Sequence, residues 1–247
     1  MSTNSEPSNH VVLYVKGGKT GTTLGACPFC QRMNMIVKLK AEGGALTYDL
    51  EIVDSTRPSK EFRKFANRLP VLKHGEEVLS DNDEIVDYLE ANFPDPGLKF
   101  DNPLANAVCL EVFSKFSFYI KQVSQSAEHM NAEMWRINDY LDQAGTKFLA
   151  GDKISNLDTL MLPKLQHIRV AAKAFRNYEM PESMTGTWRY LKNAYELKVF
   201  RESCPSDQEI VHHWSSKPEV TPLPADKQRY YCTDSEPRYS MSVPDGI

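Results

Sequence analysis

The stretch Cys27-Pro28-Phe29-Cys30 decides how this sequence folds. Two cysteines separated by two residues serve as a redox dithiol or as half of a zinc site, and they also meet by chance in buried cores. Pro28, directly after Cys27, is typical of the first turn of a helix, where the N–H that proline lacks would have no partner. Apolar residues then recur at helical spacing up to about Glu42. The stretch predicts a helix that begins just after Cys27, with Cys30 one turn further along.

The predicted helix start favours thiol chemistry. A sulfur at the cap of the helix faces free backbone N–H groups and the positive end of the helix dipole, and both favour the reactive thiolate. Cys30 could then attack a mixed disulfide formed on Cys27. Lys16 and Lys19, in the preceding segment, add positive potential, although lysines near surface loops are common. Cys27 and Cys30 are therefore the candidate catalytic pair.

A zinc site would need two more ligands, usually a second pair of cysteines at similar spacing. The other three cysteines are isolated in the sequence, and His212-His213 lies far away. No metal site is predicted. Chance pairing of two buried cysteines remains a second interpretation.

The elements around the dithiol follow in the order strand, helix, strand, helix, strand, strand, helix, which is the order of a thioredoxin-like domain over residues 10–92. Short alternating or β-branched runs predict the strands, and period-3.6 patterns predict the helices. The strands are expected at 10–15, 46–53, 69–72 and 77–79, and the helices at 28–42, 59–67 and 80–92.

Two further places in this half are candidate binding residues. Leu69-Pro70 begins the third strand, where a proline is tolerated structurally. In a thioredoxin-like domain this position is a cis-proline that places backbone groups beside the active thiol. Ser80-Asp81-Asn82 are good helix caps, and they also suit the γ-glutamyl end of glutathione, with the helix N-terminus for its carboxylate and Asp81 for its ammonium. The two roles are compatible.

Strand signals vanish after a proline-rich linker at residues 93–103. Residues 104–214 read as an all-helical domain, with a long amphipathic helix expected over 104–123. Residues 1–9 and the proline-rich tail 215–247 are expected to be mostly disordered. The fold class predicted is α/β plus all-α, with a thioredoxin-like domain followed by a helical one.

Composition excludes several classes of protein. The 247 residues carry a net charge of −4, which argues against a nucleic-acid partner. No run of about 18 apolar residues predicts a transmembrane helix. The first ten residues are polar and contain no signal-peptide core, and five scattered cysteines do not resemble a secreted disulfide framework. A reducing cytosol is the expected location.

Several separated motifs together resemble the chloride intracellular channel family, which has a glutathione transferase fold nearest the omega class. The match covers about residues 10–214, and two of its motifs, at 165–170 and 207–213, are similar to the invertebrate branch. The other motifs are Cys-Pro-Phe-Cys-Gln-Arg at 27–32 and the stretches at 115–121, 148–152, 162–165, 188–195 and 203–210.

The resemblance implies a glutathione-dependent thiol oxidoreductase with Cys27 as the active thiol and glutathione as the cofactor. The glutathione contacts it implies are Pro28, Phe29, Leu69, Pro70, Asp81 and Asn82.

It also implies a second form that enters membranes through the first helix and second strand and conducts chloride. Lys38, Lys40 and Glu42 oppose unassisted spanning, since each charge at mid-bilayer costs roughly 2.5–3.5 kcal/mol. Two alternatives remain open: an omega-like transferase or dehydroascorbate reductase without channel activity, and a non-catalytic scaffold.

Overall fold

Strand β1 (His10–Lys16) lies inside a four-stranded sheet in the computed structural model, which describes residues 9–232 and 236–247. The strand order is β2-β1-β3-β4. β1 pairs in parallel with β2 (Thr47–Val53) and antiparallel with β3 (Val71–His74), and β3 pairs antiparallel with β4 (Glu77–Leu79). Residues 1–8 of the segment expected to be disordered lie outside the described residues.

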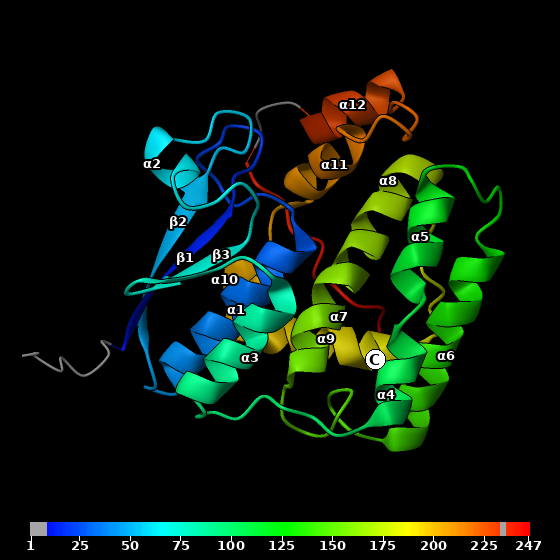
Figure 1. Ribbon diagram of the computed structural model, residues 1–247. Helices are drawn as coiled ribbons and strands as arrows, with labels where there is room; N and C mark the ends of the chain where they lie inside the picture. The colour runs from blue at the N-terminus through cyan, green and yellow to red at the C-terminus, as the bar shows by residue number, and fades with distance from the viewer. Residues whose placement is uncertain (1–8, 233–235) are drawn as a thin grey trace, which may run out of the picture.

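Alternation along β1 builds the core of this half. Val11, Leu13 and Val15 are buried on one face, where α1 (Pro28–Glu42) and α3 (Asn82–Asn92) pack (Figure 1). The short α2 (Lys60–Arg63) contributes Phe62 to a smaller cluster with Val53 and Val71. The predicted thioredoxin-like order of elements is confirmed.

The second half is all helical, as predicted, and has a core of its own. Its elements are α4 (Pro103–Cys109), α5 (Val112–Ile120), α6 (Glu128–Ala144), α7 (Asn156–His167), the π-helical turn η1 (Ile168–Ala172), α8 (Lys173–Arg176), α9 (Thr185–Glu196), α10 (Lys198–Ser203), α11 (Asp207–Ser215) and α12 (Ala225–Cys232).

The single long helix expected over 104–123 is in fact two helices, because a bend at Leu110 and Glu111 interrupts the regular helix, although both residues keep helical backbone angles. Val108 before the break and Val112 and Phe116 after it belong to the same core. The apolar spacing therefore continues across the interruption, so periodicity could not reveal it.

Helix α1 is the element that joins the two halves. One side packs on the sheet, and the other packs on α7 and α10 of the helical half. Lys38 on α1 forms an ion pair of 2.8 Å with Glu202 on α10. The helix that begins at the dithiol is therefore held by both halves.

The tail differs from the sequence expectation. Residues 216–232 and 236–247 lie against the helical half instead of being disordered, and they include α12. Val220 and Leu223 are buried in the helical core, and the backbone N–H of Asp207 donates to the carbonyl of Arg238 at 2.8 Å. The polar, proline-rich composition predicted disorder. Composition alone does not reveal that the helical half offers apolar and polar groups to which the tail can bind.

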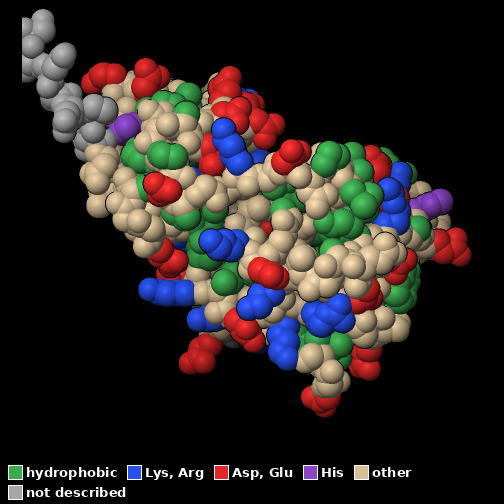
Figure 2. Space-filling model, turned by 90° about the horizontal axis from the view of Figure 1, so that it is seen from below, with side chains coloured by type: hydrophobic (Ala, Val, Ile, Leu, Met, Phe, Trp, Pro, Cys, Tyr) green, Lys and Arg blue, Asp and Glu red, His purple; other side chains and the backbone are tan. Residues whose placement is uncertain are grey.

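The face seen from below mixes charges of both signs. Lys and Arg side chains lie among Asp and Glu side chains across it, with scattered apolar groups between them (Figure 2). Among the helices of the described residues, none is both long enough and apolar enough to cross a membrane.

Candidate active site

Cys27 occupies the cap position of α1. Its backbone is extended, with φ −97° and ψ 114°, and Pro28 is the first helical residue. The Gln31 N–H donates to the Cys27 carbonyl at 3.0 Å, which closes the first helical turn. The predicted helix start is confirmed. Phe29, the next residue of the motif, is 41% exposed at the surface.

The surroundings of the Cys27 sulfur favour the thiolate. Its pKa is lowered to about 6, chiefly because the Cys30 thiol donates a hydrogen bond to it. The backbone N–H groups of Cys30 and Phe29 and the positive charge of Lys16 act in the same direction, while burial opposes them. Around neutral pH, Cys27 is therefore mostly ionised.

The surroundings of Cys30 have the opposite effect and keep its thiol protonated. It is only 2% exposed, and burial, followed by the neighbouring Cys27, raises its pKa well above the ordinary range. Its Sγ accepts a hydrogen bond from the backbone N–H of Lys16 at 3.4 Å. The pair thus combines a partly exposed thiolate with a buried, protonated thiol, which suits an attacking and a resolving cysteine.

Leu69 and Pro70 lie at the same end of the sheet as the dithiol. Tyr14 of β1 pairs with Val71 of β3, and continuing this antiparallel register brings Pro70 beside the end of β1. The Lys16 N–H that contacts Cys30 belongs to that end of β1. The Leu69–Pro70 peptide bond is cis, as the thioredoxin-like order predicts.

Asp81 is the cap of α3. Its Oδ1 accepts hydrogen bonds from the backbone N–H groups of Asp83, at 2.9 Å, and Glu84, at 3.2 Å. The capping role predicted for this turn is confirmed. The Oδ1 of the adjacent Asn82 is buried and has no hydrogen-bond partner among the described residues, so it is an acceptor that a ligand could use.

Two arginines that the sequence did not single out as site residues contact the start of α3. Arg68 precedes the cis bond, and its guanidinium donates to Ser80 Oγ at 3.1 Å and lies 3.9 Å from Asp81 Oδ2. Arg32 on α1 lies 3.4 Å from Asp83 on α3. The acidic start of α3 was the signal that could have revealed these cationic partners.

Glu209 on α11 anchors the loop that delivers the chain to Cys27. Its carboxylate accepts from the backbone N–H of Lys19 at 2.9 Å and from Thr23 Oγ1 at 3.2 Å. A Cβ at Gly18 would come within 2.4 Å of this carboxylate, so the loop approaches α11 closely because residue 18 is glycine. The Lys19 ammonium donates to the Cys232 carbonyl at 3.1 Å.

Two of the remaining thiols, Cys109 and Cys204, are buried and unsuited to attack. All five cysteines are free, and burial raises the pKa of Cys109 to about 12 and that of Cys204 further still. Within the described residues, no three His, Cys, Asp or Glu side chains come together as metal ligands.

Comparison with known proteins shows which sequences this chain is similar to. The CLIC-like N-terminal domain family matches residues 9–96. The chain is 36% identical over 203 residues to "Chloride intracellular channel exl-1" of Caenorhabditis elegans, covering 80% of this chain and 84% of that one.

Solved structures show the same fold. The crystal structure of the CLIC homologue EXC-4 from C. elegans aligns with a TM-score of 0.81 at 24% identity, over 97% of this chain and 95% of that one. Dehydroascorbate reductase from Chlamydomonas reinhardtii aligns with a TM-score of 0.73 at 26% identity, over 83% of this chain and 97% of that one. Identity along most of both sequences, together with the shared architecture, shows that this chain belongs to the chloride intracellular channel family.

Proposed function

We propose that this protein is a glutathione-dependent thiol oxidoreductase of the reducing cytosol, in which Cys27 attacks and Cys30 resolves. The observation that carries the proposal is the contrast between the two thiols: the pKa of Cys27 is about 6, and that of buried Cys30 is raised. The thiolate is the nucleophile in disulfide exchange, so the ionised, accessible sulfur attacks first.

The reaction begins with a glutathione mixed disulfide. The Cys27 thiolate attacks the glutathione sulfur, a Cys27–glutathione disulfide forms, and the other thiol leaves as a thiolate that takes a proton from water. Cys30 can then lose its proton and attack Cys27 Sγ, which closes the Cys27–Cys30 disulfide and releases reduced glutathione. A second glutathione can instead attack the mixed disulfide, which regenerates the Cys27 thiolate and releases oxidised glutathione.

The proposed glutathione site follows the end of the sheet. Pro28 and Phe29 flank the thiol, and the backbone of Leu69 and Pro70 would hold the cysteinyl part of the peptide. Asp81 and Asn82 would receive the γ-glutamyl end, with Asp81 Oδ1 already used as the cap of α3. The fold is shared with dehydroascorbate reductase and with a Leishmania glutathione transferase, which aligns with a TM-score of 0.65 at 15% identity over 85% of this chain and 49% of that one. This shared fold supports glutathione as the ligand.

Intact mass after treatment with oxidised glutathione tests the proposal. Without reduced glutathione in the solution, Cys30→Ser should gain one glutathione on Cys27 and keep it, because the protein has lost the thiol that would resolve the mixed disulfide. The wild-type protein should pass through that adduct to an internal disulfide, and Cys27→Ser should gain no adduct at this site.

Two results would contradict this order of events. An adduct on Cys30 in the Cys27→Ser protein would reverse the roles of the thiols. A wild-type protein that neither gains mass nor loses two thiols would support the non-catalytic scaffold. If the adduct forms, dehydroascorbate as the oxidant in a turnover assay tests the omega-like alternative.

A second proposal, that the protein also associates with membranes and conducts chloride, rests on membership in a family whose relative is named a chloride intracellular channel. Chloride efflux from liposomes should rise when the protein is added under oxidising conditions, relative to vesicles with reduced protein. Absence of efflux at every pH and redox condition tried would remove this proposal and leave the thiol chemistry untouched.

A further inference from the structure

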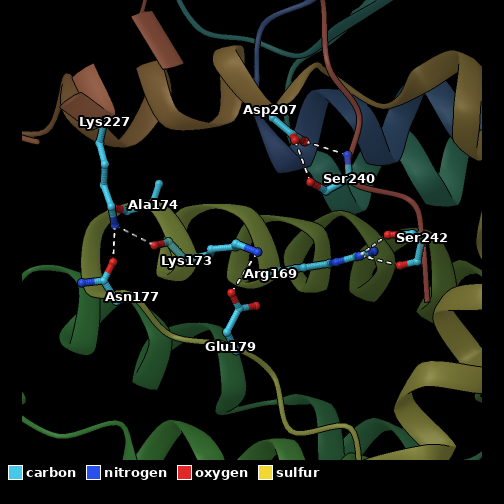
Figure 3. Close-up of polar contacts among 9 residues, drawn as sticks. All are labelled: Arg169, Lys173, Ala174, Asn177, Glu179, Asp207, Lys227, Ser240 and Ser242. Atoms are coloured by element: carbon cyan, nitrogen blue, oxygen red, sulfur yellow. Dashed lines mark hydrogen bonds and ion pairs between the residues drawn. The ribbon is translucent and has the colours of Figure 1, made fainter. Parts of the chain in front are cut away.

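Residues 236–247 of the tail bind to the helical half through hydrogen bonds that involve every polar group of Ser240. The backbone N–H of Ser240 donates to Asp207 Oδ1 at 3.0 Å, and its hydroxyl donates to Asp207 Oδ2 at 2.7 Å (Figure 3). Its carbonyl accepts from Gln166 Nε2 at 3.0 Å. Asp207 is 6% exposed and Gln166 is fully buried, so every polar group of Ser240 meets a buried partner.

Ser242, two residues further on, contacts a cation, whereas Ser240 contacts a carboxylate. Arg169 of η1 donates to the Ser242 carbonyl and lies 3.5 Å from its hydroxyl. The same guanidinium donates to the Tyr195 hydroxyl at 2.8 Å and stacks on Trp188 at 5.1 Å. Ser240 therefore lies beside the carboxylate of Asp207, and Ser242 lies beside the guanidinium of Arg169.

The docked tail completes a cavity of about 490 Å³ beside the dithiol loop. Its walls include Lys19 and Thr23 of that loop, Ser206 and Glu209 at the start of α11, and Tyr231 and Tyr239 of the tail. Removing the tail would take away one wall of this cavity.

We propose that Ser240 is a phosphorylation site, and that phosphate there releases residues 236–247 and opens the cavity. A protein kinase would transfer the terminal phosphoryl group of a nucleoside triphosphate. A bond forms between phosphorus and Ser240 Oγ, the bond to the leaving diphosphate breaks, and the hydroxyl proton goes to the base of the kinase. Local opening of this segment, which is held to the helical half mainly by polar contacts, gives the kinase access before the segment closes again.

Phosphate on Ser240 releases the tail for two reasons: it repels the carboxylate of Asp207, and it removes the hydroxyl that donates to that carboxylate. The hydroxyl that donates to Asp207 is replaced by oxygens that only accept, carrying about −1.5 to −2 charges next to a carboxylate. Arg238 lies nearby, but its guanidinium stacks on the Tyr230 ring at 4.1 Å. Arg169 is held by Tyr195 and Ser242, so both cations are already engaged. Phosphate on Ser242 would instead face Arg169.

Hydrogen exchange of the tail tests this difference. Full-length protein with phosphoserine at 240 can be assembled by joining a synthetic 232–247 peptide at Cys232. The amides of Arg238 and Ser240, which donate to Gln208 and Asp207, should exchange roughly tenfold faster or more than in the unmodified ligated protein. Phosphoserine at 242 is the matched control and should leave their exchange within about twofold of the unmodified rate.

Asp207→Asn combined with phosphoserine 240 should restore part of the protection, because the like charge is gone. Unchanged or slower exchange with phosphate on Ser240, equal release by phosphate on Ser242, or no recovery with Asp207→Asn would each overturn the mechanism. Mass mapping of the tryptic peptide 239–247 from native cells should find phosphate on Ser240, and its absence there under phosphatase inhibition would overturn the assignment of the site.

Discussion

Iodoacetamide should alkylate Cys27 with a rate that reaches half its maximum near pH 6, where its thiol is half ionised. Only the thiolate reacts, so the rate should fall about tenfold per pH unit below this point and stay flat above pH 7. An ordinary cysteine, with a pKa near 8.5, has roughly thirtyfold less thiolate at pH 7. Stopped-flow kinetics with peptide mapping would measure the rate at Cys27 alone.

Cys30→Ala supplies the control for the cause of this effect. It removes the thiol that donates to Cys27, which is the largest contribution to the lowered pKa, so the midpoint should move upward. Lys16→Gln should move it upward by less, since its charge is the smallest of the contributions. Buried Cys109 and Cys204 should remain unmodified in the folded protein. A wild-type midpoint above pH 8 would contradict the proposed role of Cys27 as the attacking thiolate.

Breaking the buried ion pair between Lys40 and Glu90 should cost about 3–5 kcal/mol of unfolding free energy. Lys40 is fully buried, and its ammonium lies 2.7 Å from Glu90 and donates to the Pro96 carbonyl at 2.7 Å. Glu90 in turn accepts from the backbone N–H of Leu98 at 3.3 Å. Lys40→Met or Glu90→Gln would each leave one charge buried without its partner, which lowers Tm by roughly 10 °C in a chain of this length.

The double variant Lys40→Met with Glu90→Met separates the charge effect from packing. It buries no unpaired charge, so it should lose less than either single variant, roughly 2 kcal/mol for the Pro96 carbonyl left without its donor and the Leu98 N–H left without its acceptor. Urea unfolding of the single and double variants measures the coupling. If each single variant lowers the free energy of unfolding by less than about 1 kcal/mol, the ion pair is not essential for holding α1, α3 and the linker together.

Local features were predictable because they depend on neighbours in the chain. Pro28 after Cys27 indicated the start of α1, and alternation along β1 indicated a strand with one buried face. The break at Leu110 and Glu111 was not predictable, since apolar spacing is the same on both sides of it. Lys40 belongs to the helix predicted over 28–42, but its partner Glu90 belongs to another helix.

The candidate site divides in the same way. Cys27, Cys30, Pro70 and Asp81 stood out because each lies at a recognisable start of a helix or strand. Glu209 did not, because it reaches the dithiol loop from 190 residues further along the chain. Contacts of that separation form only when whole domains pack, and no local pattern encodes them.

By itself, therefore, the sequence determined the order of elements, the family and the position of the dithiol at a helix start. Only the tertiary structure decided that the two thiols differ in ionisation, since burial of Cys30 and its hydrogen bond to Cys27 both arise when α1 packs between the halves. It also decided that residues 216–232 and 236–247 are ordered. A polar segment becomes ordered when buried groups such as Asp207 and Gln166 satisfy its backbone, and those groups lie far from it in sequence.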